Sequence, residues 1–337
     1  MGDVVRVGVI GAGAIAQVAH LPVLASLKGV EVVGLCDNDT VKAGALAGRF
    51  GIRDVFDDIE DLLQYSKPHA IVVCTPNHLH EIHVLTALSR GMHVLCERPL
   101  ALTVAGVEKI RTMREKSGLA LLVGMNHRFR SDVQAVRAFA NGGELGTLRD
   151  VRAGWYMFRP QRSPVVGWRE RRAESGGGAM LDIGHPLIDL GLWLAGYPVP
   201  RTVTATLSRD TPGAAVEDAG VALITCEGGV TILVDISWHF VGDAERFWLD
   251  LIGSKGSASA APLRVFKEMH GTPMNVTPTG ASGRENAFTA SYRAEWAHFL
   301  AMASGAVERP TLQDQVTLHR VIDAVYQSAA EGRSVSL

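Results

Sequence analysis

The first 125 residues alternate between short, continuously apolar runs and longer stretches in which apolar positions recur at helical spacing. The apolar runs are Val4–Ile10, Val30–Cys36, Ala70–Thr75, Val94–Glu97 and Leu119–Met125. The helical stretches are Val41–Phe50, Ile82–Arg90 and Val104–Lys116. Continuous apolar strands separated by amphipathic helices are typical of a parallel sheet that is covered on both faces. We therefore predict an α/β domain over residues 1–126.

After about residue 130 the pattern changes, because alternating or apolar runs follow one another without a long helix between them. These runs are Thr202–Leu207, Ala219–Cys226, Val230–Trp238 and Phe247–Ile252, and Glu227-Gly228-Gly229 between two of them is typical of a hairpin turn. Helices are predicted at Pro186–Ala195, Arg293–Ala303 and Gln313–Ala330, and a loop at Gly271–Ser282. The pattern predicts a second, α+β domain over residues 127–337 with a mostly antiparallel sheet. Whether the C-terminal helix packs back on the first domain stays open.

The composition is that of a two-domain globular protein, with 337 residues of which 47% are hydrophobic and 20% charged. Lys and Arg number 33 against 35 Asp and Glu, so the charge balance gives no indication of nucleic-acid binding. The four cysteines lie in apolar runs without C-x-x-C spacing, which predicts buried thiols and no metal site. Since no apolar run reaches the roughly 18 residues of a membrane helix and the N-terminus lacks signal-peptide features, we expect a cytoplasmic protein without a membrane partner.

A glycine-rich string, Gly11-Ala12-Gly13-Ala14-Ile15-Ala16, follows the first predicted strand and opens a helix. In this context Gly11 permits a tight turn, Gly13 lets the backbone approach a pyrophosphate, and Ala16 keeps the helix close to the sheet. The start of the helix supplies free N–H groups and a partial positive charge. The string therefore predicts a dinucleotide site formed by residues 11–15.

The second predicted strand ends at Asp37, 24 residues after Gly13, and Asn38 follows it. A carboxylate at this point accepts hydrogen bonds from both ribose hydroxyls of an adenosine and repels a 2′-phosphate. We therefore predict NAD as the cofactor in preference to NADP. The alternative is a strand-to-helix turn in which Asp37 only caps the helix that follows.

Three further motifs stand downstream: Thr75-Pro-Asn77-His-Leu-His80, Gly91-Met-His-Val-Leu-Cys-Glu97-Arg98-Pro99-Leu100 and Gly176-Gly-Gly-Ala-Met-Leu-Asp182-Ile-Gly-His185. Together with the glycine string and the closing segment Val321–Arg333, they resemble the Gfo/Idh/MocA family of sugar and polyol oxidoreductases. The resemblance implies a Rossmann domain followed by a domain with a mostly antiparallel sheet, a nicotinamide cofactor and a carbohydrate-like substrate. It also implies a homodimer or homotetramer formed through the open face of the C-terminal sheet.

The resemblance implies roles for individual residues as well. A first set would lie beside the cofactor: Thr75, Pro76, Asn77, His80, Glu97, Arg98, Pro99 and Asn126. A second set would face the substrate: Arg98, Trp168, Arg169, Asp182 and His185. Two of these residues also have a purely local interpretation, since His80 could only cap a helix and Trp168 could only pack in the core.

The sequence departs from the family pattern at two positions, and the first is the residue before Pro99. The family usually has Lys there, and this chain has Arg98. A guanidinium, with a pKa above about 12, does not shuttle a proton, but it can donate hydrogen bonds to a substrate oxygen and stabilise developing negative charge. We therefore expect Arg98 to hold the reacting oxygen rather than to act as a base.

The second departure concerns the histidine that the family usually has four residues after Asp182. Pro186 occupies that position, and His185 comes one residue earlier. Proline in the first helical turn would leave His185 at or near the N-cap, where its imidazole either carries the substrate proton or only caps the helix. Tyr156 and His127 are further candidate acids, and we count Tyr156 among the substrate residues.

Residues 149–172 form a basic stretch that carries seven arginines against Asp150 and Glu170. The arginines are Arg149, Arg152, Arg159, Arg162, Arg169, Arg171 and Arg172, and the interleaved aromatic residues are Trp155, Tyr156, Phe158 and Trp168. Aromatic faces stack on sugar rings, and arginine binds carboxylates and phosphates through paired hydrogen bonds. The stretch therefore favours an anionic substrate such as a sugar acid or a phosphorylated sugar. The alternative is a solvated loop or a subunit contact.

Residues and resemblance together predict an NAD-dependent oxidoreductase that acts on a secondary alcohol or ketone of a sugar, a cyclitol or a related hydroxylated compound. In this interpretation Asp182 orients the reacting oxygen and His185 carries its proton. Two different functions stay open. One is that of a degenerate family member that binds the dinucleotide without turnover, because both usual proton-handling residues are changed. The other uses NAD within an elimination or a hydrolysis.

Overall fold

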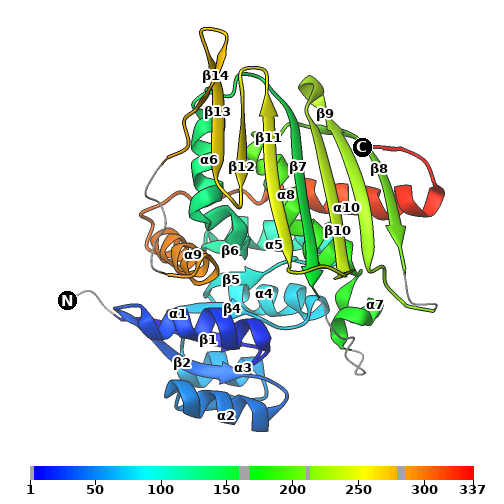
Figure 1. The fold of residues 1–337 in the computed structure, drawn as a ribbon. Helices are drawn as coiled ribbons and strands as arrows, with labels where there is room; N and C mark the ends of the chain where they lie inside the picture. Colours follow the sequence, from blue (N-terminus) through cyan, green and yellow to red (C-terminus); the bar gives the residue numbers. More distant parts are fainter. Residues whose placement is uncertain (1–3, 159–166, 210–212, 279–284) are drawn as a thin grey trace. The chain divides into compact units, whose positions relative to one another are not determined.

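The computed structural model describes residues 4–158, 167–209, 213–278 and 285–337, and it contains two compact units (Figure 1). Unit 1 is formed by the chain up to Asn126 together with Glu285–Gln315. Unit 2 is formed by the chain from His127 onwards together with Val316–Leu337. The chain therefore passes from unit 1 to unit 2, returns to unit 1, and ends in unit 2.

Unit 1 is built on a parallel sheet of six strands in the order β3-β2-β1-β4-β5-β6. The strands are β1 (Val5–Ile10), β2 (Val30–Cys36), β3 (Asp54–Phe56), β4 (Ala70–Val73), β5 (His93–Glu97) and β6 (Leu121–Gly124). Val9 and Val72 pair across β1 and β4 and are fully buried, as expected for a sheet covered on both faces. The predicted Rossmann-type α/β domain is thus confirmed. Its strand order reverses between β1 and β4, where ligands bind at the carboxyl ends of the strands in such sheets.

The helices of unit 1 are α1 (Leu21–Ser26), α2 (Thr40–Phe50), α3 (Ile59–Asp61), α4 (His80–Ser89), α5 (Val104–Ser117) and α9 (Ala287–Ala303). Their ends follow from local chemistry. The Asp39 side chain caps the start of α2, and Gly51 ends that helix in the left-handed conformation. Thr103 and Gly118 bound α5 in the same way.

Helix α9 joins unit 1 from a distant part of the chain. Its Tyr292, Trp296 and Phe299 are buried in one hydrophobic cluster with Val7 and Val9 of β1. The sequence alone leaves open whether the C-terminal helix packs back on the first domain. The structure places that helix, from Val316 onwards, in unit 2, and it is α9 that belongs to unit 1, with its large apolar side chains buried there.

Unit 2 is built on a sheet of nine strands in the order β14-β13-β12-β11-β7-β10-β9-β8-β15. The strands are β7 (Leu148–Phe158), β8 (Pro200–Ser208), β9 (Ala219–Cys226), β10 (Thr231–Phe240), β11 (Arg246–Gly253), β12 (Gly256–Ala260), β13 (Arg264–Met269), β14 (Thr272–Asn275) and β15 (Val335–Ser336). Within this sheet β7 and β10 run parallel, and the other pairs are antiparallel. The predicted mostly antiparallel sheet is confirmed, including the hairpin turn Glu227–Gly229 between β9 and β10.

Helices cover one face of this sheet (Figure 1). They are α6 (Ser131–Asn141), α8 (His185–Leu194) and α10 (Gln313–Glu331), and the short α7 (Arg172–Ser175) precedes α8. Burial alternates along the strands, so that Ile232, Val234 and Ile236 of β10 are buried and the residues between them are half-buried. On the uncovered face Val221 and Leu223 of β9 are 41% and 39% exposed.

Two parts of unit 2 differ from the prediction. The central strand β7 lies in the basic stretch and is not predicted, because exposed Arg149 and Arg152 alternate there with buried Val151 and Ala153. Residues 272–275 are predicted as part of a loop but form β14, which pairs with β13. Since every residue of β14 is exposed, no apolar pattern could reveal this edge strand.

Candidate active site

The glycine string forms a tight loop between β1 and the helical segment that follows. Gly11 has a φ of +100°, and a Cβ there would lie 2.7 Å from the carbonyl carbon and oxygen of Cys74, so a larger residue does not fit. A Cβ on Gly13 would meet the Cys74 oxygen at an ordinary 3.7 Å. Neighbouring protein atoms therefore leave room at Gly13, as close approach of a pyrophosphate requires. Ala14 and Ile15 begin the helical segment.

Asp37 follows β2 and binds the glycine loop directly. Its Oδ2 accepts a hydrogen bond of 2.6 Å from the Ala12 N–H, its Oδ1 accepts one of 3.0 Å from the Asp39 N–H, and Lys42 Nζ lies 3.0 Å from Oδ1. Burial by itself would raise the pKa of Asp37, but these hydrogen bonds and the Lys42 charge outweigh burial and lower it. The carboxylate is therefore ionised and held beside the loop, and exposed Asn38 comes next.

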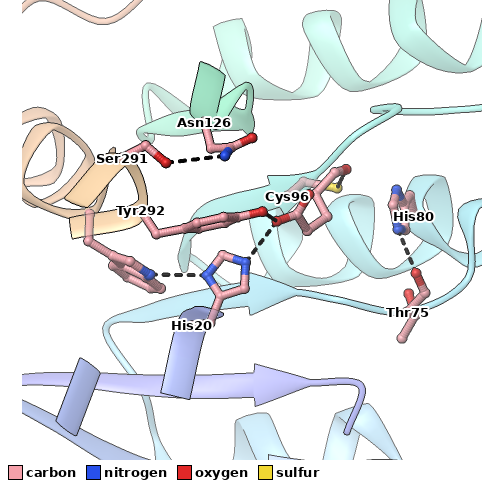
Figure 2. Close-up of polar contacts among 9 residues, drawn as sticks. His20, Thr75, His80, Cys96, Asn126, Ser291 and Tyr292 are labelled. Carbon is pink, nitrogen blue, oxygen red and sulfur yellow. Dashed lines mark hydrogen bonds and ion pairs between the residues drawn. The ribbon is translucent and has the colours of Figure 1, made fainter. Parts of the chain in front are cut away.

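His80, the first residue of α4, links the segments that follow β4 and β5. Its Nδ1 lies 2.6 Å from the Pro99 carbonyl oxygen. Its Nε2 lies 2.8 Å from the Thr75 carbonyl oxygen (Figure 2). Burial lowers the pKa of His80, and the two carbonyls act in the opposite direction. Because both ring nitrogens face these carbonyls, His80 holds the two segments together and does not cap its helix.

Glu97, at the end of β5, is the centre of a buried hydrogen-bond network (Figure 2). His20 Nε2 lies 2.9 Å from Glu97 Oε1, and the Tyr292 hydroxyl donates to the same oxygen at 3.3 Å. Trp296 Nε1 donates to His20 Nδ1 at 3.0 Å. An indole N–H can only donate, so the ring proton of His20 resides on Nε2 and is donated to Glu97. Burial would raise the pKa of Glu97, but the hydrogen bond from His20 and the positive charge of Arg98 lower it.

Glu295 lies on α9 one turn beyond Tyr292 and is fully buried. Neither carboxyl oxygen has a hydrogen-bond partner among the described residues. Burial raises the pKa of Glu295 well above its ordinary value, the Glu97 carboxylate raises it further, and the Arg98 guanidinium opposes them. The environment of Glu295 therefore favours its neutral, protonated form, and the side chain lies close enough to Glu97 and Arg98 to sense their charges.

Two further predicted residues lie at the same edge of the sheet. Asn126 follows β6 and is buried, and its Nδ2 donates to the Ser291 hydroxyl of α9 at 3.2 Å (Figure 2). Arg98 follows β5, is half-buried and precedes a cis bond to Pro99. The predicted cofactor residues of unit 1 thus all lie at or after the carboxyl ends of parallel strands: Gly11, Ala12, Gly13, Ala14, Ile15, Asp37, Asn38, Thr75, Pro76, Asn77, His80, Glu97, Arg98 and Asn126.

In unit 2 the structure brings together three of the predicted substrate residues. Asp182 lies in a π-helical turn, Met180–Gly184, and its Oδ2 accepts a hydrogen bond of 3.0 Å from Trp238 Nε1. Arg169 Nε lies 3.5 Å from Asp182 Oδ1, and its guanidinium stands 4.5 Å from the Trp168 ring centre. Trp168 is half-buried rather than part of the core, so it and Arg169 surround a partly exposed carboxylate.

His185 is the first residue of α8 and follows the N-cap residue Gly184, so it lies near the N-cap as predicted. Gly184 and His185 both have helical backbone angles, so the chain is continuously helical from Met180 into α8. Pro186 stands in the first turn of α8, where a missing N–H costs little. The His185 side chain is fully buried, with its ring edge-to-face against His319 of α10 at 5.6 Å.

Tyr156 is separated from Asp182 by the sheet. Its hydroxyl donates to Asp235 Oδ2 at 2.5 Å, and Asp235 lies on the uncovered face of β10. Trp238, the partner of Asp182, lies on the helix-covered face. Burial and the Asp235 carboxylate raise the pKa of Tyr156 to about 12. This placement argues against Tyr156 as a proton donor in one site with Asp182, because strand parity puts the two side chains on opposite faces.

The structure disperses the basic stretch. Arg149 and Arg152 are exposed on β7, and Arg171 pairs with Glu174. His127, the other candidate acid, packs between Trp155 and Phe247 in an aromatic cluster. Arg159 and Arg162 lie outside the described residues.

Comparison with known proteins bears on both units. Residues 5–125 match the family described as "Oxidoreductase family, NAD-binding Rossmann fold", and residues 133–259 match the "GFO/IDH/MocA C-terminal domain". The chain belongs to the Gfo/Idh/MocA oxidoreductase family. Unit 1 is accordingly an NAD-binding Rossmann domain, and the dinucleotide-binding domain predicted from the glycine string is confirmed.

The chain is similar over nearly its full length to characterised family members. It is 27% identical to D-glucoside 3-dehydrogenase of Escherichia coli, over 98% of this chain and 97% of that protein. It is 29% identical to D-apiose dehydrogenase of Paraburkholderia graminis, over 94% of this chain and 86% of that protein. The crystal structure of GenD2 from gentamicin A biosynthesis in complex with NAD superposes with a TM-score of 0.86 at 26% identity, covering 100% of this chain and 97% of that chain.

Several residues of this family member that shape the site were not predicted from the sequence: His20, Glu217, Trp238, Tyr292, Glu295 and Trp296. The signal for two of them was present, because His20 and Glu295 are polar positions among buried apolar ones, on helical segments. Such a position requires a polar partner or a neutral state. All four cysteines are buried free thiols. Within the described ranges there is no helix long and apolar enough to cross a membrane, and no cluster of metal-ligating side chains.

Proposed function

We propose that this chain is an NAD-dependent oxidoreductase that transfers hydride between nicotinamide and a secondary alcohol or ketone of a sugar, a cyclitol or a related hydroxylated compound. The observation that carries the proposal is the ionised Asp37 carboxylate bonded to the glycine loop. The two relatives named above are dehydrogenases of sugars, which supports a carbohydrate-like substrate. A bound nicotinamide supplies the hydride chemistry, and the chain supplies binding, orientation and proton handling.

The residues of unit 1 fit NAD better than NADP. Residues 13–15, at the start of the helical segment, offer backbone N–H groups to a pyrophosphate. The N–H groups of Gly11 and Ala12 already donate to Cys36 and Asp37. The Asp37 carboxylate accepts hydrogen bonds from the hydroxyls of the adenosine ribose, and its negative charge repels a 2′-phosphate. Lys42 already pairs with Asp37, so it does not act as an independent phosphate partner.

Arg98 holds the reacting oxygen of the substrate. Its guanidinium stays charged during turnover, so it stabilises an alkoxide electrostatically without exchanging a proton. The His80 ring faces the Thr75 and Pro99 carbonyls, so it ties the segment after β5, which carries Arg98, to the segment after β4. The network of Glu97, His20 and Tyr292 supports the same segment from the core.

In unit 2 Asp182 orients the substrate hydroxyl, and Trp168 and Arg169 bind the substrate beside it. The Trp238 indole holds one Asp182 oxygen and Arg169 lies near the other, so the carboxylate has a defined direction. His185 is the proposed proton carrier, because an imidazole exchanges protons near neutral pH. Tyr156 is not included in this set, given its place on the opposite face of the sheet.

A second candidate function is that of a degenerate family member that binds the dinucleotide without turnover. Two observations favour it: Arg98 stands where a proton-shuttling Lys is usual, and His185 is fully buried against His319. Such a protein would sense or sequester the dinucleotide.

One experiment separates the two candidates. Purified protein is incubated with NAD and a panel of sugars, polyols and sugar acids, and NADH formation is followed by its absorbance. The oxidoreductase proposal expects NADH with at least one compound, and loss of that signal in Asp182→Ala. A degenerate member is expected to bind NADH, as detected by fluorescence, without turnover of any compound.

We also propose a homodimer or homotetramer formed through the uncovered face of the unit 2 sheet. Val221 and Leu223 of β9 and Phe266 of β13 are exposed on strands of this sheet, where they would form an apolar contact. Light scattering should give a mass of two or four chains. A charged Leu223→Glu variant should shift the mass toward the monomer, and an unchanged mass would contradict this interface.

A further inference from the structure

Glu217 is a fully buried carboxylate in the segment between β8 and β9. A single oxygen, Oε1, accepts hydrogen bonds from the Gly178 N–H at 2.9 Å, the Met180 N–H at 3.0 Å and the Tyr326 hydroxyl at 2.8 Å. Its other oxygen has no hydrogen-bond partner among the described residues. The backbone N–H groups of Gly178 and Met180 both donate to this one oxygen, so Glu217 holds the segment that leads into the Met180–Gly184 turn.

The same contacts explain why the chain has glycines at 177 and 178. A Cβ on Gly177 would collide with the Tyr326 hydroxyl, and a Cβ on Gly178 would collide with the Glu217 carbonyl oxygen. That carbonyl also accepts the Ala179 N–H at 2.9 Å. The glycine-rich motif is therefore shaped by close approach of Glu217 and Tyr326, which press on it from two different parts of unit 2.

Asp218, the residue after Glu217, contacts Trp238, which is the hydrogen-bond partner of Asp182. The Asp218 carbonyl accepts the backbone N–H of Trp238 at 2.8 Å, and the Trp238 indole donates to Asp182 Oδ2. Residues 217 and 218 thus contact both the turn that carries Asp182 and the strand residue that holds its carboxylate. A shift of this short segment would move the donor and the acceptor of that hydrogen bond relative to each other.

We propose that Glu217, with Tyr326 as its support, is a positioning residue that sets the direction of the Asp182 carboxylate toward the substrate. The inference rests on the proposed function only for the role of Asp182. Removal of the Glu217 carboxylate leaves two buried backbone N–H groups and a buried hydroxyl without their acceptor, so the turn rearranges to satisfy them. The side chains of Asp182 and Trp238 then lose their present alignment.

The Trp238 indole provides a test that does not need turnover. The chain has six tryptophans, so the indole N–H resonances of ¹⁵N-labelled protein can be resolved, and Trp238→Phe assigns the relevant one. Asp182→Ala gives its position without the hydrogen bond. We expect Glu217→Ala and Tyr326→Phe to move the Trp238 resonance toward its position in Asp182→Ala, and the shift should be larger in Glu217→Ala. The other five indole resonances should stay in place. Glu217→Gln keeps an acceptor oxygen and should restore the wild-type position.

Ser328→Ala is the matched control, because Ser328 is an equally buried hydrogen-bonding residue of α10 that bonds Ala205 and Arg333 instead. It should lower stability without moving the Trp238 resonance. If Glu217→Ala does not fold, Tyr326→Phe decides, since it removes one of three donors and keeps the carboxylate. An unmoved Trp238 resonance in folded Glu217→Ala, or in Tyr326→Phe when Glu217→Ala does not fold, overturns the proposal.

Kinetics complete the test once a substrate is known. Misplacement of a catalytic carboxylate should lower kcat by roughly tenfold to a hundredfold in Glu217→Ala, with the NADH dissociation constant unchanged because the nucleotide residues lie in unit 1. If the Trp238 resonance shifts while kcat stays unchanged, the role of Asp182 in the proposed function is contradicted, and the inference that Glu217 aligns Asp182 is supported. An unmoved indole contradicts the inference alone.

Discussion

His20 and Glu97 are 77 residues apart in the chain, yet the His20 Nε2 lies 2.9 Å from the Glu97 Oε1 in the core of unit 1. Trp296 donates to the other ring nitrogen, which fixes the proton on Nε2. Glu97 comes immediately before Arg98, so the histidine determines how the carboxylate beside the proposed oxygen-binding residue is held. His20 is fully buried, so it supports the segment of Glu97 and Arg98 from within the core of unit 1.

Replacement of His20 by Ala should therefore destabilise unit 1. The change leaves the buried Glu97 carboxylate and the Trp296 N–H without their partner, which we expect to lower the free energy of unfolding by about 2–4 kcal/mol. Urea unfolding followed by circular dichroism measures the change. His78→Ala is the control, because His78 is exposed on the same segment as His80. Equal stability of the two variants would contradict the network.

Glu295→Gln should stabilise the protein in a pH-dependent way. The pKa of Glu295 is raised in the folded state, mainly by burial, so between its ordinary value near 4.5 and the raised value the folded chain holds a proton that the unfolded chain releases. Stability of the wild type consequently falls as pH rises through this window, by about 1.4 kcal/mol for each unit of raised pKa. Gln does not titrate, so the advantage of the variant should be small at pH 5 and grow toward pH 8. Melting temperatures measured across this range test it, and a pH-independent difference would contradict a neutral Glu295.

Asp37→Ser should change the preference between the two dinucleotides. Loss of the carboxylate removes the ribose acceptor and frees Lys42 to pair with a 2′-phosphate. We expect the dissociation constant of NADH to rise by about tenfold to a hundredfold, as loss of one charged hydrogen bond of about 1.5–3 kcal/mol implies, and that of NADPH to fall. Fluorescence titrations measure both. Asp39→Asn keeps the cap of α2 and should leave both constants unchanged. Tighter binding of NADPH than NADH by the wild type would contradict the role of Asp37.

Substitutions at Arg98 distinguish an active enzyme from a degenerate one. Arg98→Ala removes the proposed contact to the reacting oxygen and should lower kcat/KM by about a hundredfold or more, the effect of losing one preorganised donor. Arg98→Lys keeps a positive charge and should leave partial activity. A Lys variant that gains activity absent from the wild type would favour the degenerate family member, and full activity of Arg98→Ala would contradict the assigned role.

The parallel sheet and its ligand-binding edge could be predicted because the information is local. The buried strands of unit 1 are short runs of mostly apolar residues, and residues that bear chemistry come directly after them: Gly11 after β1, Asp37 after β2 and Arg98 after β5. Since all the strands are parallel, chain order alone brings these residues to one edge. The bonds that fix Asp37 to Ala12 and Lys42 are likewise local or one strand away.

The supports of the site could not be predicted in this way, because they depend on contacts between distant segments. Trp296 meets His20 across 276 residues, and Tyr326 meets Glu217 across 109. Tyr156 shows a different cause. Its strand β7 is hidden by alternating arginines, so the parity that places Tyr156 on the face opposite the helices cannot be read from the apolar pattern. Recognition of that strand would remove Tyr156 from the candidate acids.

Binding of the reduced dinucleotide is the most direct test of the account, because every assigned role presupposes it. Titration of the purified chain with NADH, followed by energy transfer from tryptophan to the nicotinamide, should give saturable binding of one molecule per chain, competed by NAD and weakened in Asp37→Ser. Absence of any saturable signal with NADH or NAD, in protein shown to be folded, would contradict the central claim.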